Sequence, residues 1–354
     1  MQTNSLVSII VPTFNRVHLL RQTLLSCLLQ TYGNIEILVV DDGSDEDIES
    51  AAYGVCRNET DRKKISIYRQ RHAGGSAARN LGIQESEGDY IQFLDSDDLM
   101  HPQKLEMQVH ILNNRTDLDM VYGLDLYFRD IPGDMSEVWN MPNELDDLDR
   151  FLADDGVWHT ASPLWRRTAV KNNCAWNSSI VCWQDWEYHI LAICRGIKYA
   201  HVPMALQFIR DHDGPRITNI ENVIEREESK MQAGAAVLEC LSTHGLLTKK
   251  RGNLLALYFI EVGIGLKIHG RNDLSARAMK LAGSSASALF KALVALTELS
   301  CFVDEERTLR YFHRARQGLL RLTGSTTGTW KSIKLNDVHV PESFLATLQQ
   351  AATR

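Results

Sequence analysis

The stretch Tyr90–Asp98, with the sequence YIQFLDSDD, is the most informative part of the chain. An apolar run ends there in a turn that carries three carboxylates. Such a strand places hard oxygen ligands at the carboxyl edge of a sheet, which is where open α/β folds bind their ligands. Carboxylates this close repel one another unless a cation or a proton lies between them. The stretch therefore points to a divalent ion that bridges the protein to a phosphorylated ligand, although an Asp-rich surface turn or a helix cap would have the same composition.

Strand and helix signals alternate around this stretch. Apolar runs at 7–11, 35–40 and 65–68 are expected strands, and 19–29 and 77–84 have the pattern of helices. Continuous apolar runs separated by helices indicate a parallel sheet that is covered on both faces. We therefore expect an α/β fold built on an open, doubly wound, mostly parallel sheet.

The character of the sequence changes beyond residue 219. Five segments between residues 225 and 322 carry apolar residues at helical spacing. We expect an all-α C-terminal region there. The boundary is placed around Gly214 and Pro215, which gives an N-terminal domain of residues 1–215 and a helical domain of residues 216–354.

Bulk composition narrows the function. The formal net charge of −7 argues against a general nucleic-acid binder, which needs a basic face. The seven cysteines form no CxxC pair, which suggests reduced thiols and a cytoplasmic setting. The apolar stretches at 254–268 and 286–303 are interrupted by charges, so no membrane span is expected.

Four polar segments line up with the ends of the expected strands. They are PTFNR at 12–16, DDGS at 41–44, GGSAARN at 74–80 and DSDD at 95–98. In this order and spacing they resemble the family 2 glycosyltransferases, which have the GT-A fold, and the resemblance extends to about residue 213. It implies an enzyme that moves a sugar from a nucleoside-diphosphate donor to an acceptor hydroxyl, with inversion, in glycan or glycoconjugate biosynthesis.

The first two segments are assigned to the nucleotide by this resemblance. It implies that Pro12, Thr13 and Asn15 pack around the base and the ribose, and that Asp41 accepts a hydrogen bond from the base. Uracil fits best, because a buried carboxylate that reads an N–H group rejects an analogue that lacks this donor. Asp42 would hold either the turn or the ribose.

The glycine pair Gly74-Gly75 opens a helix. It lets the backbone approach a ligand closely, and the N–H groups of a helix N-terminus suit anions. Arg79 on this helix is expected to pair with the diphosphate or with Asp95, or to lie on the helix surface.

The acid turn supplies the metal ligands that the resemblance implies. Asp97 would ligate Mn²⁺ or Mg²⁺, Asp95 would contact the ribose or the metal, and Ser96 would contact the donor nucleotide. Asp98 leaves the register open by one residue. A metal that bridges both phosphates would stabilise the charge on the departing nucleoside diphosphate. His212 is a further candidate, either as a metal ligand or phosphate partner or as a structural histidine.

The segment Trp183–Glu187, WQDWE, resembles the part of the family that carries the catalytic base. The family's usual Glu-Asp pair is here Gln184-Asp185, so one acid is lost. We assign the base to Asp185, which would take the proton from the acceptor hydroxyl. The alternatives are Glu187 as the base, and a simple helix-capping role for Asp185.

Other aromatic and histidine side chains have no settled role. Trp158, Trp165 and Trp183 would either stack on a sugar ring or pack in the core. No motif assigns a role to His72, His159 or His189.

Two alternatives to a glycosyltransferase remain at this stage. A nucleotidyltransferase needs a glycine-rich basic loop after the first strand, which PTFN at 12–15 does not provide. A non-catalytic sugar-nucleotide-binding protein is disfavoured because the acids at 95, 97 and 185 are all present.

The expected partners are a nucleoside-diphosphate sugar and a glycan, lipid-linked or other hydroxyl acceptor, and not a nucleic acid. Arg314, Arg316 and Arg321 lie beside leucines at 319, 320 and 322. This pattern indicates either an amphipathic helix in peripheral contact with the inner face of a membrane or the solvated basic face of a packed bundle.

Overall fold

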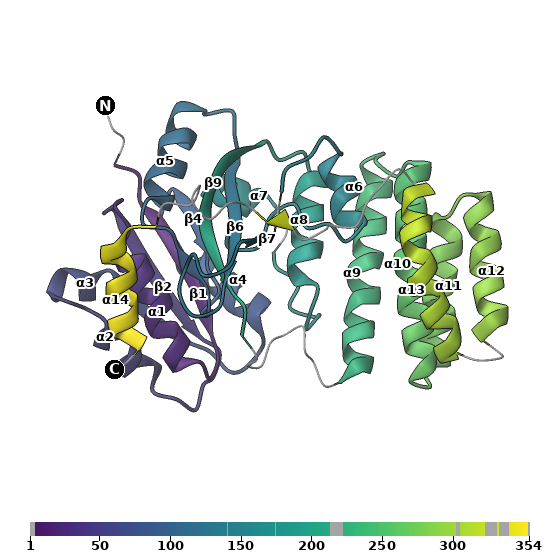
Figure 1. Ribbon diagram of the computed structural model, residues 1–354, viewed down its shortest axis with the longest axis horizontal. Helices are drawn as coiled ribbons and strands as arrows, with labels where there is room; N and C mark the ends of the chain where they lie inside the picture. Colours follow the sequence, from purple (N-terminus) through teal and green to yellow (C-terminus); the bar gives the residue numbers. More distant parts are fainter. Residues whose placement is uncertain are drawn as a thin grey trace.

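The structure is a computed structural model that describes residues 4–139, 141–173, 175–212, 222–301, 305–322, 331–332 and 340–352. An α/β unit and a stack of helices lie side by side along the long axis (Figure 1). The predicted boundary at 213–219 falls largely outside the described residues, so the division of the chain at residue 215 stays a prediction.

The α/β unit contains the predicted open sheet. Four parallel strands lie in the order β4-β1-β2-β3. They are β1 (Val7–Thr13), β2 (Ile35–Asp41), β3 (Ile65–Arg69) and β4 (Tyr90–Phe93). Each begins at the predicted residue and ends within two residues of the predicted end. β1, β2 and β4 are largely buried, as mostly apolar strands of a covered parallel sheet should be, whereas β3 at the edge is largely not buried.

Helices cover this sheet on both faces because successive side chains of a strand point in opposite directions. Ile9 of β1 packs in one apolar cluster with Leu20 and Leu24, and Ile10 packs in another with Ala78. The covering helices are α1 (Val17–Leu28) and α4 (Gly75–Glu85). The carboxyl ends of β1, β2 and β4 therefore open at one edge of a rigid layer.

A mixed extension widens the sheet beyond β4. β8 runs antiparallel to both β4 and β6, and β9 runs parallel to β6. The segment at 120–128, which has apolar runs on both sides of Gly123, is one continuous strand. The added strands are β5 (Leu99–Met100), β6 (Met120–Phe128), β7 (Glu137–Val138), β8 (Leu164–Arg166) and β9 (Tyr199–Arg210).

Further short helices pack around this sheet. They are α2 (Ile48–Gly54), α3 (Glu59–Lys63), α5 (Lys104–Asn114), α6 (Asp147–Leu152), α7 (Arg167–Asn172) and α8 (Gln184–Cys194). Of these, α6 and α8 face the helical region, where α6 contacts α10 (Lys249–Ile268) and α8 contacts α9 (Val223–Thr243).

The helical C-terminal region is confirmed. Its helices are α9 (Val223–Thr243), α10 (Lys249–Ile268), α11 (Asn272–Ser285), α12 (Ala288–Cys301) and α13 (Glu305–Leu322). α10 lies at the centre and contacts α9, α11, α12 and α13, which explains why its sequence is apolar on most sides. None of the described helices combines the length and the apolar content that crossing a membrane requires.

The end of the described chain returns to the α/β unit (Figure 1). α14 (Glu342–Ala352) lies against α1, where Phe344 and Leu348 join an apolar cluster with Leu25, Phe128 and Phe208. The short strand β10 (Lys331–Ser332) pairs antiparallel with β7. Residues far beyond the helical stack therefore help to hold the sheet.

Candidate active site

β4 delivers the acid turn to the carboxyl edge of the sheet, next to β1. There Asp95 accepts a hydrogen bond from Arg79, with 2.6 Å between Oδ1 and Nη2. The guanidinium of Arg79 also lies over the ring of Trp176, 4.6 Å from its centroid. Of the partners that were proposed for Arg79, the structure thus shows Asp95.

Asp97 is bound by a second pair of groups. Its Oδ2 accepts a hydrogen bond from Arg16 Nη1 at 2.5 Å and lies 3.1 Å from His212 Nε2. Burial opposes ionisation, but the hydrogen bond to His212 and the charge of Arg16 hold the pKa of Asp97 below its ordinary value. Asp97 and His212, the two residues predicted as metal ligands from separate segments, are thus in contact.

Asp98 is the most deeply buried of the three acids. Its Oδ1 accepts a hydrogen bond from the backbone N–H of Arg210 at 3.0 Å, and its Oδ2 lies 3.6 Å from His159 Nδ1. Burial raises the pKa of Asp98 well above its ordinary value; His159 opposes this shift, and the charges of Asp97 and Asp95 add to it. A carboxylate in this position favours a neighbouring cation or proton.

His159 was not expected here, because no sequence motif assigned it a role. Its backbone N–H donates to Asp125 Oδ2 at 3.0 Å, which anchors it to β6. One ligand atom each from Asp95, Asp98 and His159 lie within 4.8 Å of one another. Carboxylate oxygens suit Mg²⁺ and Mn²⁺, and the buried Oδ2 of Asp98 makes no hydrogen bond among the described residues. The donor set therefore fits a divalent cation.

The turn after β1 lies beside the turn after β2. Thr13 pairs in register with Asp41, and its buried hydroxyl finds no hydrogen-bond partner within the described chain. Asn15 has a positive φ of 49°, and its side chain accepts a hydrogen bond from the N–H of Asp45 at 2.8 Å. Pro12 is half-buried on the same strand. The residues predicted to surround the nucleotide are therefore brought together.

Asp41, the last residue of β2, and Asp42, which follows it, have different hydrogen-bond partners. Asp41 is buried; its Oδ1 accepts from the N–H of Ser44 at 2.8 Å, and its Oδ2 lies 3.3 Å from Arg69. Asp42 instead holds the segment before α4, accepting hydrogen bonds from the N–H groups of Ala73 and Gly74, each at 2.8 Å. The prediction for Asp42 was its own turn or the ribose; the structure shows its carboxylate on the segment before α4 instead, and Asp41 on the turn.

An aromatic pair at the opening of the site was also missed from the sequence. The rings of Phe14 and His72 are stacked with their centroids 4.2 Å apart, and Phe14 is 40% exposed. They come from segments 58 residues apart (72 − 14), so no local pattern marks them as partners. Within the acid turn itself, Ser96 is buried.

α8 begins next to the start of α4. A Cβ atom on Gly75 would lie 3.7 Å from the side-chain oxygen of Gln184. Asp185 is in the first turn of α8, and its charge is among those that raise the pKa of His159 against the opposing effect of burial. Glu187 is buried and accepts two hydrogen bonds from Asn177 at 3.2 and 3.1 Å. The carboxylate of Glu187 is thus already engaged, and the base role of Asp185 stays a prediction.

The tryptophans divide into two groups. Trp158 and Trp165 are buried in the core, so the sugar-stacking role is wrong for them and the packing role is right. Their segment folds inward, where Trp158 contacts Phe151 and Tyr199 edge-on. Trp183 is half-buried, with the ammonium of Lys230 4.4 Å from its ring centroid, and its sugar-stacking role stays a prediction.

Comparison with known proteins identifies the N-terminal part. Residues 8–167 match the sequence profile described as glycosyl transferase family 2. This part of the chain is a family 2 glycosyltransferase domain. The matched region includes the acid turn and His159 but ends before Asp185 and His212.

Curated relatives resemble this glycosyltransferase domain over part of their length. An uncharacterised glycosyltransferase from Rickettsia conorii is 42% identical over 106 residues, which is 30% of this chain and 17% of that protein. One from Haemophilus influenzae is 39% identical over 147 residues, 40% of this chain and 56% of that protein. A UDP-Glc:α-D-GlcNAc-diphosphoundecaprenol β-1,3-glucosyltransferase from Escherichia coli is 36% identical over 119 residues, 33% and 45% of the two chains. The chain thus spans at most about half of these relatives.

Solved structures share the fold over nearly the whole chain. Residues 1–349 of S. aureus TarS in complex with UDP-GlcNAc match with a TM-score of 0.59 and 15% identity, covering 95% of this chain and 97% of that one. A mannosyltransferase from Pyrobaculum calidifontis in complex with GDP-Man and Mn²⁺ matches with a TM-score of 0.52 and 17% identity, covering 89% and 86%. The GT-A fold of the glycosyltransferase domain, followed by helices, is therefore confirmed.

Proposed function

We propose that this protein transfers a sugar from a nucleoside-diphosphate sugar to an acceptor hydroxyl, with inversion and with the help of a divalent cation. The observation that carries the proposal is the arrangement at the sheet edge. One ligand atom each from Asp95, Asp98 and His159 lie within 4.8 Å of one another there, His212 contacts Asp97, and Arg79 of the helix that Gly75 begins pairs with Asp95. These contacts support a cation site beside the diphosphate, and Asp185 in the first turn of α8 would supply the base.

The donor would lie across the carboxyl ends of β1 and β2. Thr13 and Asp41 would contact the base and Asn15 the ribose, while the free N–H groups at the start of α4 would face the diphosphate. Asp42 fixes these groups by holding Ala73 and Gly74. Ser96 and Arg79 would contact the donor's phosphate end.

In the proposed reaction, Asp185 would lie opposite the leaving group. Asp185 would accept the proton of the acceptor hydroxyl as its oxygen bonds to the anomeric carbon. The bond from that carbon to the phosphate oxygen breaks in the same step, and the electron pair leaves with the nucleoside diphosphate. Since the nucleophile attacks opposite the leaving group, the configuration inverts.

A divalent cation, Mn²⁺ or Mg²⁺, would supply electrostatic stabilisation of the departing diphosphate when bound. Asp95, Asp97, Asp98, His159 and His212 are the side chains that would hold it. Asp97 pairs with Arg16 and Asp95 with Arg79, so these carboxylates already have cationic partners, which a bound metal would join or displace.

UDP-sugars are the proposed donors, in line with the predicted reading of uracil by Asp41. The E. coli protein is named for UDP-glucose, and S. aureus TarS was solved in complex with UDP-GlcNAc. The Pyrobaculum protein, in contrast, was solved with GDP-Man. We also propose a glycan or lipid-linked acceptor and a role in polysaccharide biosynthesis. The support is the E. coli protein, which is named for a lipid-linked acceptor, α-D-GlcNAc-diphosphoundecaprenol.

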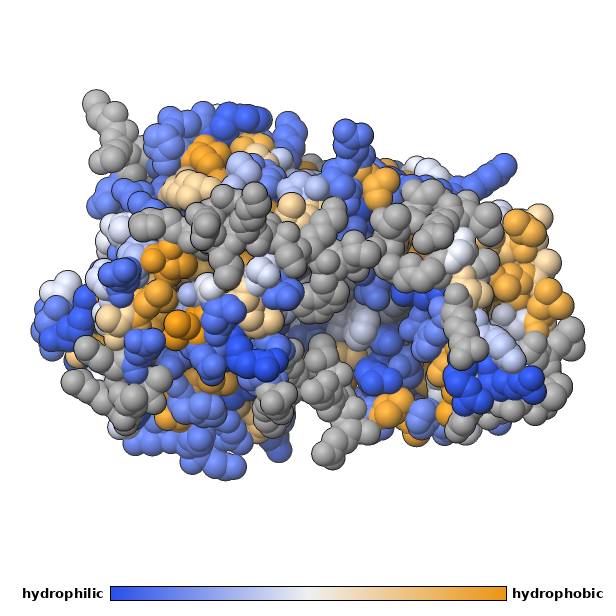
Figure 2. Space-filling model, viewed as in Figure 1, coloured by the Kyte–Doolittle hydropathy of each residue, from blue (hydrophilic) through white to orange (hydrophobic). Residues whose placement is uncertain are grey.

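A cytoplasmic protein with peripheral membrane contact is the proposed setting. Figure 2 shows an apolar area over α12, at the right-hand end, where Leu289 and Leu296 are 72% and 61% exposed. The basic residue Arg316 does not serve this contact, because it pairs with Glu261 at 3.3 Å. Arg314 and Arg321 are outside the described side chains.

The proposal is tested by nucleotide release. The full chain would be incubated with UDP-glucose or UDP-N-acetylglucosamine, with Mn²⁺ or with EDTA, and free UDP would be measured. Release that requires metal supports the transferase, because hydrolysis is the slow reaction of such an enzyme without acceptor. Binding of UDP without any release from either donor, with and without sugar acceptors, would instead favour the non-catalytic sugar-nucleotide-binding protein.

A further inference from the structure

Asn80 is the last residue of the segment at 74–80 and has no part in the proposed donor site. Its side-chain amide pairs with the backbone of Trp176. Asn80 Nδ2 donates to the carbonyl oxygen of Trp176 at 2.8 Å, and the N–H of Trp176 donates to Asn80 Oδ1 at 2.9 Å. An amide side chain carries both a donor and an acceptor, so it can hold the two polar groups of one backbone residue at once. The start of the loop at 176–183 is therefore fastened to α4.

The ring of Trp176 contacts the elements that carry the two halves of the proposed site. It stacks on Tyr188 of α8 with the ring centroids 4.1 Å apart, and it meets Phe93 of β4 edge-on at 5.3 Å. Its face also lies under the guanidinium of Arg79. Phe93 ends β4 just before the acid turn, and Tyr188 is about one turn further along α8 than Asp185. The position of Trp176 is therefore tied both to the acid turn and to the start of α8.

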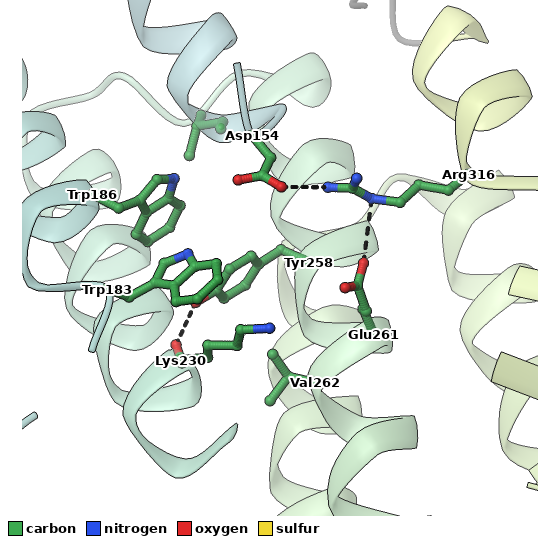
Figure 3. Close-up of a pocket in the computed structure, with 9 residues that line it drawn as sticks. Asp154, Trp183, Trp186, Lys230, Tyr258, Glu261, Val262 and Arg316 are labelled. Carbon is green, nitrogen blue, oxygen red and sulfur yellow. Dashed lines mark hydrogen bonds and ion pairs between the residues drawn. The ribbon is translucent and has the colours of Figure 1, made fainter. Parts of the chain in front are cut away.

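The helical region holds the other end of the same loop. The N–H of Val181 donates to the hydroxyl of Ser229 at 3.1 Å. The ammonium of Lys230 lies over the ring of Trp183, beside which it is drawn in Figure 3. Ser229 and Lys230 are neighbours on α9. The loop at 176–183, which leads directly into α8, is thus held by α4 at its start and by α9 at its end.

The loop ends in a strained residue. Trp183 has a φ of 61° and directly precedes α8, and its side chain makes no capping hydrogen bond. A bulky side chain at positive φ is unfavourable, and it persists only where the surrounding structure holds it. Relaxation of this φ would redirect the start of α8, which carries Asp185 in its first turn. The contacts at both ends of the loop oppose this relaxation.

We propose that Asn80 and Ser229 are positioning residues for the transfer step. Acting through the loop at 176–183, they hold Asp185 at a fixed place relative to the acid turn, and neither side chain touches the donor or the acceptor. This inference rests on the proposed function, because it takes Asp185 as the base. It also gives the helical region a part in the reaction, since α9 supplies one of the two anchors.

Steady-state kinetics of the full chain with UDP-glucose or UDP-N-acetylglucosamine and Mn²⁺ test the proposal, with UDP release as the readout. Asp185 would activate the attacking water in this reaction as it would an acceptor hydroxyl. Asn80→Ala and Ser229→Ala remove the two anchors. Asn34→Ala is the control for the first, because it removes a side-chain bond to a backbone carbonyl just before the start of β2, at the opposite end of the sheet. Ser275→Ala is the control for the second, because it removes a buried hydroxyl that is bound to a backbone carbonyl of α10.

We expect kcat to fall at least about tenfold in Asn80→Ala and in Ser229→Ala, since a catalytic group displaced by about 1 Å can lose about 10²-fold in rate. The KM for the donor should stay unchanged, because the donor contacts are not altered. Both controls should keep the kcat of wild type. A loss of kcat no greater than in the controls, or a raised KM at unchanged kcat, would overturn the positioning role. If Asn80→Ala does not fold, Ser229→Ala and its control decide the question alone.

Thermal stabilisation by UDP and Mn²⁺, measured on the same proteins, separates this inference from the proposed function. If UDP with Mn²⁺ stabilises wild type and both anchor variants equally and all of them release UDP at the same rate, the positioning role is wrong and the transferase stands. If wild type neither releases UDP nor is stabilised by it, the transferase is wrong, and the positioning role with it.

Discussion

Substitution of Asp42 by alanine is expected to loosen the segment that opens α4. The carboxylate of Asp42 accepts three hydrogen bonds, from Gln70 Nε2 at 2.7 Å and from the N–H groups of Ala73 and Gly74 at 2.8 Å each. All three donors precede the helix whose N–H groups would face the diphosphate. Asp42→Ala therefore acts on stability and on nucleotide affinity together.

The magnitude follows from these contacts. A hydrogen bond to a charged group contributes roughly 1.5–3 kcal/mol, so three give a nominal sum of about 4.5–9 kcal/mol. Water can replace part of this because the donors are only partly buried. We therefore expect a loss of about 2–4 kcal/mol in the free energy of unfolding and a UDP affinity at least about tenfold lower.

Urea denaturation and calorimetric titration of UDP in the presence of Mn²⁺ measure the two effects. Asp45→Ala is the matched control, because Asp45 is an exposed acid three residues further along the same turn. Equal unfolding free energies for Asp42→Ala and the control, within about 0.5 kcal/mol, would refute the role of Asp42 in the segment.

Three further predictions concern other parts of the molecule. Asp185→Asn is expected to lower the transfer rate by about 10²–10⁴ while UDP affinity stays unchanged; a nearly normal rate would remove the assigned base. Burial raises the pKa of Asp125 to about 6 from an ordinary value of 3.8, so the folded chain keeps a proton that the unfolded chain releases. The free energy of unfolding should then fall as pH rises from about 4 to 6, by up to roughly 3 kcal/mol. Urea denaturation of wild type across this pH range should show this fall, and the Asp125→Asn variant should not. The same pH dependence in both proteins would contradict the raised pKa of Asp125. Gly252→Ala would bring a Cβ atom to 2.1 Å from the carbonyl oxygen of Ser285, so we expect a loss of about 1–3 kcal/mol. Gly283→Ala, which meets no atom within 4 Å, is the control, and equal melting points for the two variants would show that α10 and α11 do not pack this closely.

The parallel core could be predicted well from the sequence, because each of its strands is determined by a short local run of residues. An apolar run such as Ile35–Asp41 can be buried on both faces only as an inner strand, and the polar turns that follow these runs must meet at one edge. The sequence therefore predicts that the acid turn, the glycine pair and the nucleotide turn lie together.

The missed features depend on contacts between distant segments. His159 lies 61 residues beyond Asp98 (159 − 98) in the sequence, and the two meet in the fold, where Asp125 of β6 binds the backbone N–H of His159. The stacking of Phe14 on His72 has the same origin. No short-range periodicity or residue spacing in the sequence indicates such contacts.

The tryptophans show the opposite difficulty. Trp158, Trp165 and Trp183 have the same side chain and similar neighbours in the sequence, yet two are buried and one is half-buried. Which of them faces a ligand depends on how α8 packs against α9. Composition alone could not decide this.

The central claim is that the acid turn holds a divalent cation on the diphosphate of the donor. Anomalous diffraction from crystals grown with UDP and Mn²⁺ tests it most directly. The account predicts a manganese peak bonded to both phosphates and to a carboxylate oxygen of Asp95, Asp97 or Asp98. Ordered UDP at the sheet edge with no manganese between its phosphates and these three side chains would contradict it.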